Sequence, residues 1–203
     1  MDTKLWSMEW GGKTLTVEMG RLALQANAAC TVRVGDTVIL ATAVMSKNTR
    51  DGIDYFPLMV NYEEKFYAAG KILGSRFVRR EGRSSDEAVL TGRLIDRTIR
   101  QLFDQRMRRE VQLVITVLTY DGENDPDFIG LLSASTALAI SPIPWDGPVA
   151  GIKIFKTKDS SEVKFNPNLN ETANAKMEID AFVSGTKERI NMIELEGDEA
   201  QES

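Results

Sequence analysis

Guanidinium groups are concentrated in one short stretch of this chain. Ten of its fourteen arginines lie between Arg76 and Arg109, and none of its eleven lysines does. Ten arginines against five acidic residues give this stretch a net charge of +5, although the whole chain has a formal net charge of −5. A guanidinium is planar, forks onto phosphate or carboxylate and stacks on flat rings, which an ammonium group does not. The chemistry expected of this stretch is therefore the binding of phosphates, carboxylates or flat rings.

The first part of the stretch, residues 76–83, is predicted to be a loop, because Gly74 precedes it and Gly82 lies near its end. The loop brings one aromatic ring close to three guanidiniums, on Phe77, Arg79, Arg80 and Arg83. Arginines contact the phosphates of a single nucleic-acid strand, and an aromatic ring stacks on a base. This composition therefore predicts a binding site for single-stranded nucleic acid.

The second part of the stretch is predicted to be an amphipathic helix. Ser84 followed by Glu87 has the spacing of a capping box. At 3.6 residues per turn, one face is apolar and holds Ala88, Ile95, Ile99 and Leu102. The opposite face presents the guanidiniums of Arg93, Arg97 and Arg100. Two uses stand open for these three: RNA binding, or ion pairs with the chain's excess acid or with a neighbouring subunit.

The strands that must position this stretch are marked by turn signals. Gly11-Gly12 predicts a hairpin over residues 5–19, and Gly35-Asp36 predicts another over residues 28–45. Leu58 to Tyr62 is predicted to be a strand, and two further hairpins are expected over residues 149–165 and 177–195. Val111 to Leu118 is apolar on both faces, so we expect it to be a central strand.

A second helix follows that central strand. Asp125 is a suitable N-cap, and Pro126 suits the first helical position. Residues 128–140 are apolar nearly all round, so this helix is expected to be buried. The order of elements predicts the α+β class, with a mostly antiparallel sheet and helices packed on one of its faces.

Composition limits the classes of function. A length of 203 residues suits one domain, and contents of 42% hydrophobic and 27% charged residues are typical of a soluble globular protein. Cys30 is the only cysteine, which excludes an internal disulfide and fits a reducing compartment. No stretch reaches the length of a membrane span without polar breaks, so we expect a cytoplasmic protein without a membrane partner. The absence of histidine excludes a Ser-His-Asp triad and any histidine-ligated metal within this chain.

The arginine-rich stretch also resembles a known family. FVRREGRSSDEAVLTGRLIDRTIRQLF is similar to the first core domain of polynucleotide phosphorylases, which show a Phe-Phe-Arg-Arg-Glu-Gly-Arg loop followed by a helix ending Arg-Leu-Ile-Asp-Arg-Pro-Leu-Arg-Pro-Leu-Phe. The likeness continues through VQLVITVLTYDGENDPDFIG and SPIPWDGPVAGI and spans nearly the whole chain. The chain departs from the family pattern where it has Val78, Ser84, Thr98 and Gln101. Val78 removes one ring of the loop but leaves the arginine pair.

The resemblance implies a fold and a function. It implies one ribonuclease PH-like domain over residues 1–203, an N-terminal core domain that stops before its last helix. The implied function is RNA binding within a phosphate-dependent 3′-to-5′ exoribonuclease, a polyribonucleotide nucleotidyltransferase that takes part in mRNA degradation. The implied partners are single-stranded RNA, the second core domain of the same protein and two further copies in a homotrimeric ring. In such a ring, the arginine loop lies at the mouth of the central channel.

The resemblance also indicates where chemistry is absent. In active domains of this fold, phosphate binds at the N-terminus of the second helix, but here Asp125 and Asp127 would repel it and Pro126 removes a donor. Glu178 corresponds to one metal-binding carboxylate, while a second is replaced near Thr172, and one carboxylate is too few for Mg²⁺. We therefore predict no catalytic and no metal-binding residue here, and expect Mg²⁺ and inorganic phosphate at the second core domain.

Two alternatives to an RNA-binding domain stay open. One is a free-standing enzyme of the ribonuclease PH type, which the acidic turn at Asp125 disfavours. The other is a structural or oligomerisation domain whose arginines serve subunit interfaces. Binding of single-stranded RNA that depends on salt would distinguish the RNA-binding domain from the structural one.

Overall fold

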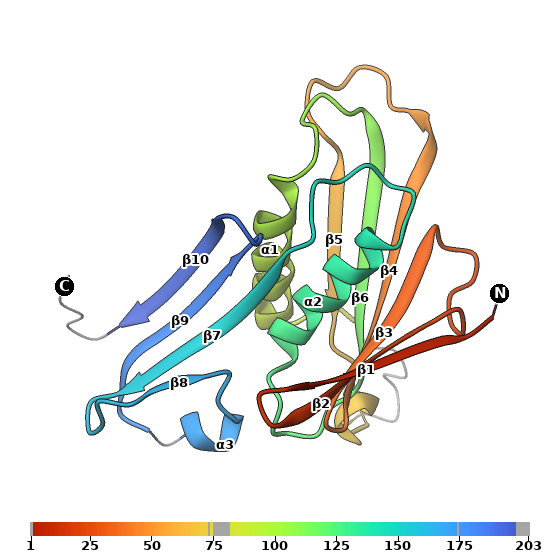
Figure 1. The fold of residues 1–203 in the computed structure, drawn as a ribbon. Helices are drawn as coiled ribbons and strands as arrows, with labels where there is room; N and C mark the ends of the chain where they lie inside the picture. Colours follow the sequence, from red (N-terminus) through yellow and green to blue (C-terminus); the bar gives the residue numbers. More distant parts are fainter. Residues whose placement is uncertain (1, 73, 75–81, 174, 198–203) are drawn as a thin grey trace.

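Strands with apolar residues at alternate positions form the larger of two sheets (Figure 1). The computed structural model describes residues 2–72, 74, 82–173 and 175–197. The strands of the larger sheet are β1 (Lys4–Trp10), β2 (Lys13–Met19), β3 (Ala28–Val34), β4 (Thr37–Thr49), β5 (Leu58–Glu63) and β6 (Arg109–Thr119). Their order is β1-β2-β3-β4-β6-β5. The two predicted hairpins and the interior position of Val111 to Leu118 are confirmed.

One strand pair of this sheet is parallel and shapes the rest of the fold. β5 runs parallel to β6, whereas the other neighbouring strands in the sheet are antiparallel. A parallel pair needs a crossover connection, and here it comprises residues 64–108. This crossover contains the short helix η1 (Phe66–Ala69), the arginine loop and helix α1 (Asp86–Arg100). The arginine loop is thus part of the connection between two adjacent strands.

The second sheet lies on the far side of the helices (Figure 1). It is antiparallel, with the order β10-β9-β7-β8, and consists of β7 (Ala150–Thr157), β8 (Val163–Phe165), β9 (Met177–Gly185) and β10 (Ile190–Gly197). These are the two predicted C-terminal hairpins. A single turn of helix, α3 (Leu169–Thr172), precedes β9. Helices α1 and α2 (Pro126–Ala139) contact both sheets, so the sequence prediction of helices on one face of a sheet holds for the larger sheet.

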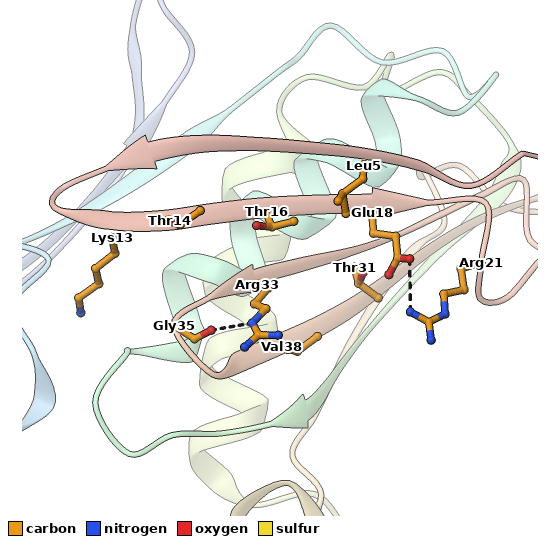
Figure 2. A pocket seen from close by; sticks show the side chains of 10 residues that line it. All are labelled: Leu5, Lys13, Thr14, Thr16, Glu18, Arg21, Thr31, Arg33, Gly35 and Val38. Atoms are coloured by element: carbon orange, nitrogen blue, oxygen red, sulfur yellow. Dashed lines mark hydrogen bonds and ion pairs between the residues drawn. The ribbon is translucent and has the colours of Figure 1, made fainter.

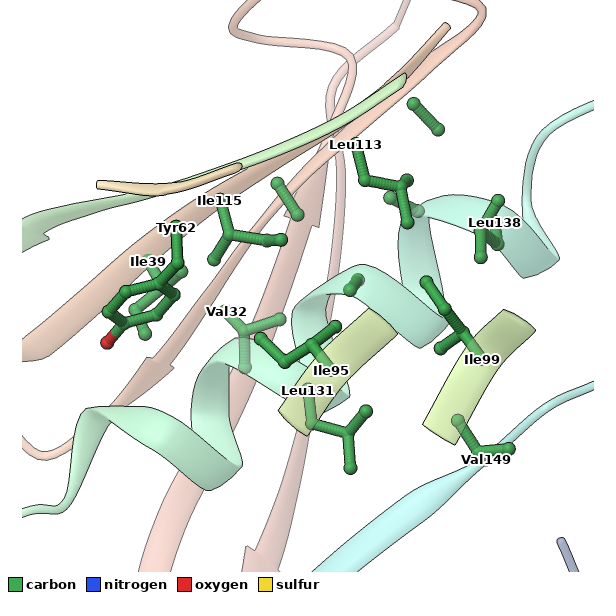
Figure 3. Packing of buried hydrophobic residues seen from close by; sticks show 14 of the residues in the cluster. Val32, Ile39, Tyr62, Ile95, Ile99, Leu113, Ile115, Leu131, Leu138 and Val149 are labelled. Carbon is green, nitrogen blue, oxygen red and sulfur yellow. The ribbon is translucent and has the colours of Figure 1, made fainter. Parts of the chain in front are cut away.

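The core lies between the larger sheet and the two helices. Figure 3 shows apolar side chains from these three sources pointing toward one another, namely Ile39, Leu113 and Ile115 from the strands, Ile95 and Ile99 from α1, and Leu131 and Leu138 from α2. Asp125 is the N-cap of α2 and its carboxylate accepts a hydrogen bond from the Asp127 amide at 2.9 Å, as the sequence predicts. A methyl group on Gly130 would come within 3.0 Å of the Tyr62 ring, so glycine lets α2 approach the sheet.

Two further observations bear on the sequence predictions. Cys30 is buried, its thiol donates to the Ser133 carbonyl at 3.4 Å, and burial raises the pKa of that thiol to about 12. Within the described part of the chain, none of the helices has the length and apolar character needed to cross a membrane.

Candidate functional site

The described residues fix both ends of the predicted RNA-binding loop. Phe77, Arg79 and Arg80 lie outside the described residues, so their contribution stays a prediction. Arg83 is described and its side chain is exposed, two residues before the N-cap of α1. The location of the loop is therefore given by η1 on one side and by the start of α1 on the other.

The η1 end is held by backbone hydrogen bonds. The buried Ala68 accepts a hydrogen bond from the Tyr120 amide at 2.9 Å, which attaches η1 to the end of β6. Gly70 ends the helix with a φ of 65°, in the left-handed region that glycine adopts without steric cost. Its amide donates to the Tyr67 carbonyl at 3.0 Å. These hydrogen bonds therefore hold the chain in place at η1, before the loop begins.

The α1 end is held by a cap that differs from the predicted one. Ser85, not Ser84, is the N-cap, and its hydroxyl oxygen accepts a hydrogen bond from the Ala88 amide at 3.0 Å. Ser85 has the extended backbone that an N-cap requires, with φ of −62° and ψ of 158°. The same hydroxyl donates to the Glu64 carboxylate at 3.0 Å. The predicted N-cap, Ser84, is wrong because the capping-box pattern considers only neighbouring residues. The observed N-cap, Ser85, also bonds to Glu64 on the other side of the loop.

The three helix arginines have different surroundings. Arg93 is exposed, and Arg97 pairs with Glu194 of β10 at 3.6 Å while 61% of its side chain is exposed. Arg100 instead donates to Asp96 at 2.5 and 2.7 Å, and to backbone carbonyls beside β5. The prediction of three guanidiniums on one exposed face is therefore wrong for Arg100. Asp96 lies one turn before Arg100, which brings the two side chains together.

Arg100 is consequently expected to stabilise the fold. Its guanidinium reaches the carbonyls of Phe56 at 3.3 Å and Leu58 at 3.1 Å, at the outer edge of the sheet. Arg100→Ala leaves these carbonyls and Asp96 without that partner, so we expect the free energy of unfolding to fall by about 1–2 kcal/mol. Arg93→Ala, at an exposed position on the same helix, should change it by less than about 0.5 kcal/mol. Urea denaturation of both variants checks this, and equal losses would contradict it.

The N-terminus of α2, where active domains of this fold are expected to bind phosphate, is occupied by the chain's own side chains. The Lys153 ammonium, on β7, lies 3.3 Å from the Asp125 carboxylate and 3.4 Å from the Asp180 carboxylate of β9. All three side chains are mostly buried, with exposures of 22%, 15% and 27%. An internal cation thus neutralises carboxylates at the end of the helix, and a phosphate would meet Asp125 there.

Asp127 is the most perturbed carboxyl group of this region. It is partly buried in the first turn of α2. Burial, together with the negative charges of Asp125 and Glu64, raises the pKa of Asp127 to about 7, although a hydrogen bond from Thr91 acts in the opposite direction. The carboxylate form is therefore costly in the folded protein.

This pKa predicts how stability depends on pH. The pKa of Asp127 rises on folding from an ordinary value of 3.8 to about 7, so the folded state holds the proton at pH values where the unfolded state has lost it. Its contribution to stability therefore falls as pH rises from about 4 to about 7 and stays low above that range. The free energy of unfolding of Asp127→Asn is compared with that of wild type at each pH. This difference should favour the variant by about 1–2 kcal/mol more at pH 8 than at pH 4. Urea titrations at both pH values measure this gain, and a difference independent of pH would contradict the assignment.

The described carboxylates do not form a site for Mg²⁺. Glu178 pairs with Lys156 at 2.7 Å, and Asp180 is shared with Lys153. Lys153, the partner of Asp180, also contacts the Asp125 carboxylate at the N-cap of α2. Among the described residues, no group of three or more carboxylate or cysteine side chains is placed to hold a metal ion. The carboxylates that the structure describes therefore do not fit Mg²⁺.

An open hollow of about 850 Å³ lies on the outer face of β1 to β4 (Figure 2). Its cations have partners within the chain: Arg21 pairs with Glu18 at 3.4 Å, and Arg33 donates to the Gly35 carbonyl at 2.8 Å. Of the predicted RNA-binding residues that the structure describes, none lines this hollow. This hollow therefore adds nothing to the predicted site.

Comparison with known proteins shows the family to which this chain belongs. Residues 11–144 match the model of the 3′ exoribonuclease family, domain 1. The chain is 49% identical over 195 residues to the polyribonucleotide nucleotidyltransferase of Phenylobacterium zucineum, which covers 96% of this chain and 27% of that protein. It is 48% identical over 202 residues to that of Staphylococcus saprophyticus, covering all of this chain and 28% of that protein. The chain thus spans about a quarter of the length of these relatives.

A solved structure supports the fold alone. The crystal structure of rice (Oryza sativa) Rrp46 aligns with a TM-score of 0.70 over 98% of this chain and 82% of that chain, at 13% sequence identity. The α+β architecture of the ribonuclease PH type expected from the sequence is confirmed. The polynucleotide phosphorylase family named from the loop and helix motifs is confirmed as well.

Proposed function

On the premise that this chain belongs to the 3′ exoribonuclease family, domain 1, we propose that it is the RNA-binding N-terminal core domain of a phosphorolytic 3′-to-5′ exoribonuclease. The observation that carries the proposal is the arginine loop, whose two ends are fixed while Arg83 remains exposed. A loop with three guanidiniums and a phenyl ring has both kinds of group that a single RNA strand needs. Phe77, Arg79, Arg80 and Arg83 are the proposed RNA-binding residues.

The whole protein is proposed to degrade RNA to nucleoside diphosphates, with the reaction at a second core domain outside this chain. The relatives named polyribonucleotide nucleotidyltransferase are about three and a half times as long as the chain, which leaves room for such a domain. Mg²⁺ and inorganic phosphate are proposed to bind there, because Lys153 and Asp125 occupy the corresponding helix end here. The whole protein is further proposed to form a homotrimer, to be located in the cytoplasm and to take part in mRNA turnover.

The test of RNA binding is its dependence on salt. If Arg79, Arg80 and Arg83 each neutralise one phosphate, the logarithm of the association constant should fall against the logarithm of salt concentration with a slope of about −2 for single-stranded RNA. A slope near zero would favour the structural alternative, in which arginines make ion pairs within the protein. Arg97 with Glu194 and Arg100 with Asp96 are described ion pairs within the chain that favour this alternative.

The free-standing enzyme is the other alternative, and an activity assay separates it. We predict that the 203-residue chain releases no nucleoside diphosphate from poly(A) in the presence of phosphate and Mg²⁺. The reason is that Asp125, Asp180 and Glu178 are paired with lysines, which leaves no site for phosphate or metal among them. Turnover by the pure chain that Glu178→Ala abolishes would show that the domain has its own active site.

A further inference from the structure

A hydrogen bond closes the segment that carries the RNA-binding loop. Glu64 follows the last residue of β5, and Ser85 is the N-cap of α1, so the bond of 3.0 Å between them joins residues on either side of the loop. The Ser85 hydroxyl donates to Glu64 and accepts from the Ala88 amide at 3.0 Å. These two bonds connect the end of β5 to the N-cap and first turn of α1, and Arg83 lies two residues before Ser85.

Electrostatics alone would disfavour a carboxylate at this place. The negative charge of Glu64 acts on Asp127 and on the buried Tyr62, and it contributes to the raised pKa of both groups. A negative charge at the base of a cationic loop also weakens the attraction of that loop for phosphate. What the carboxylate offers here is its geometry, because it accepts the hydroxyl that begins α1.

From this arrangement we infer that Glu64 is a positioning residue for the RNA-binding loop. The inference rests on the proposed function, and it assigns Glu64 no contact with RNA. Its carboxylate holds Ser85 and thereby fixes the point and direction in which the chain passes from the loop into α1. Binding groups act efficiently only when neighbouring hydrogen bonds hold their backbone in place. On one side of the loop, Ala68 thus holds η1, and on the other side Glu64 holds the start of α1, two residues after the exposed Arg83.

A matched pair of variants separates geometry from charge. Glu64→Ala and Glu64→Gln both remove one negative charge, which by electrostatics alone should tighten RNA binding equally. Only the glutamine keeps a polar group that can bond to the Ser85 hydroxyl. We expect Glu64→Ala to weaken binding of single-stranded RNA about 3- to 10-fold relative to Glu64→Gln, with Glu64→Gln equal to wild type or tighter. Equal affinities of the two variants would overturn the inference.

A second variant tests the same bond from the other side. Ser85→Gly removes the hydroxyl without changing charge, and glycine is a tolerable N-cap that costs only a few tenths of a kcal/mol. We expect Ser85→Gly to weaken RNA binding by a similar factor, and the double variant with Glu64→Ala to be no weaker than either single one, because one shared bond is lost once. Additive losses would overturn the inference. Hydrogen exchange of residues 82–88 should accelerate in Glu64→Ala but not in Glu64→Gln.

The experiment distinguishes this inference from the proposed function. In the same assay, Arg79→Ala with Arg80→Ala tests whether the loop binds RNA at all. Loss of binding in that variant, together with equal affinities for Glu64→Ala and Glu64→Gln, would leave the proposed function standing and remove Glu64 from it. Wild-type binding by the arginine variant would refute the proposed function, and with it the positioning role.

Discussion

Replacing Arg79 and Arg80 together by alanine is expected to weaken binding of single-stranded RNA about tenfold or more near 0.1 M salt. Each lost phosphate contact removes roughly 0.7 from the salt slope, so the slope should change from about −2 to about −0.7, the part left to Arg83. Fluorescence anisotropy with a labelled oligonucleotide at several salt concentrations measures both quantities. Arginines in this loop have the charge and the planar fork that phosphate binding requires.

The loss should be similar for all RNA sequences, because phosphate contacts carry no base information. Phe77→Ala should behave differently. Loss of one stacked base costs roughly 1–3 kcal/mol of binding, while the salt slope should stay nearly unchanged because no charge is removed. Affinity and salt slope together therefore separate the aromatic contribution to binding from the cationic one.

The controls must be lysines that the fold does not use. Lys153 looks suitable from the sequence, on a hairpin far from the loop, but the structure excludes it because it pairs with Asp125 and Asp180. Lys47 near the end of β4 and Lys187 in the turn after β9 are exposed and serve instead. Their alanine variants should bind RNA within about twofold of wild type. Wild-type affinity of the double arginine variant, in protein shown to be folded, would make the loop structural.

The sequence predicts local elements of this fold better than long-range ones. The α2 cap at Asp125 and the four hairpins depend on neighbouring residues, and all are present. The parallel pairing of β5 with β6 depends on a crossover of residues 64–108, and no local pattern specifies it. The second sheet likewise forms because its strands contact helices distant in sequence, which a pattern of alternation does not reveal.

The candidate site shows the same division. Asp96 four residues before Arg100 is a spacing that favours an ion pair, so the internal role of Arg100 had a signal in the sequence. Glu64 and Ser85 are 21 residues apart, and only the fold brings them together. Lys153 has no local carboxylate partner either, since Asp125 is 28 residues away along the chain. Residue types thus predict which chemistry a region favours, while the fold decides which charges are already satisfied.

Lys153→Met is expected to lower the free energy of unfolding by about 2–3 kcal/mol. Methionine keeps the length and packing of the side chain but leaves Asp125 and Asp180 facing each other without a cation. Breaking a buried ion pair costs several kcal/mol, and the partial exposure of these groups reduces that figure. Burial alone would lower the pKa of Lys153, but Asp125 and Asp180 raise it, so its charge is stabilised by folding. The stabilisation is fully present below the ordinary lysine pKa of 10.5 and is lost only as pH rises through the raised folded value, so urea denaturation at pH 7 measures it in full.

Lys156→Met is the matched control, on the same strand and with the same replacement. Lys156 has one carboxylate partner, Glu178 at 2.7 Å, within its own sheet, so its loss should cost about 0.5–1 kcal/mol. Combining Lys153→Met with Asp180→Asn should cost less than the sum of the two single changes, because the second removes a charge that the first leaves unpaired. Equal stabilities of the two lysine variants, or additive losses in the cycle, would show that Lys153 does not join the second sheet to α2. The occupied helix end would then no longer support the proposal that phosphate binds at the second core domain instead of here.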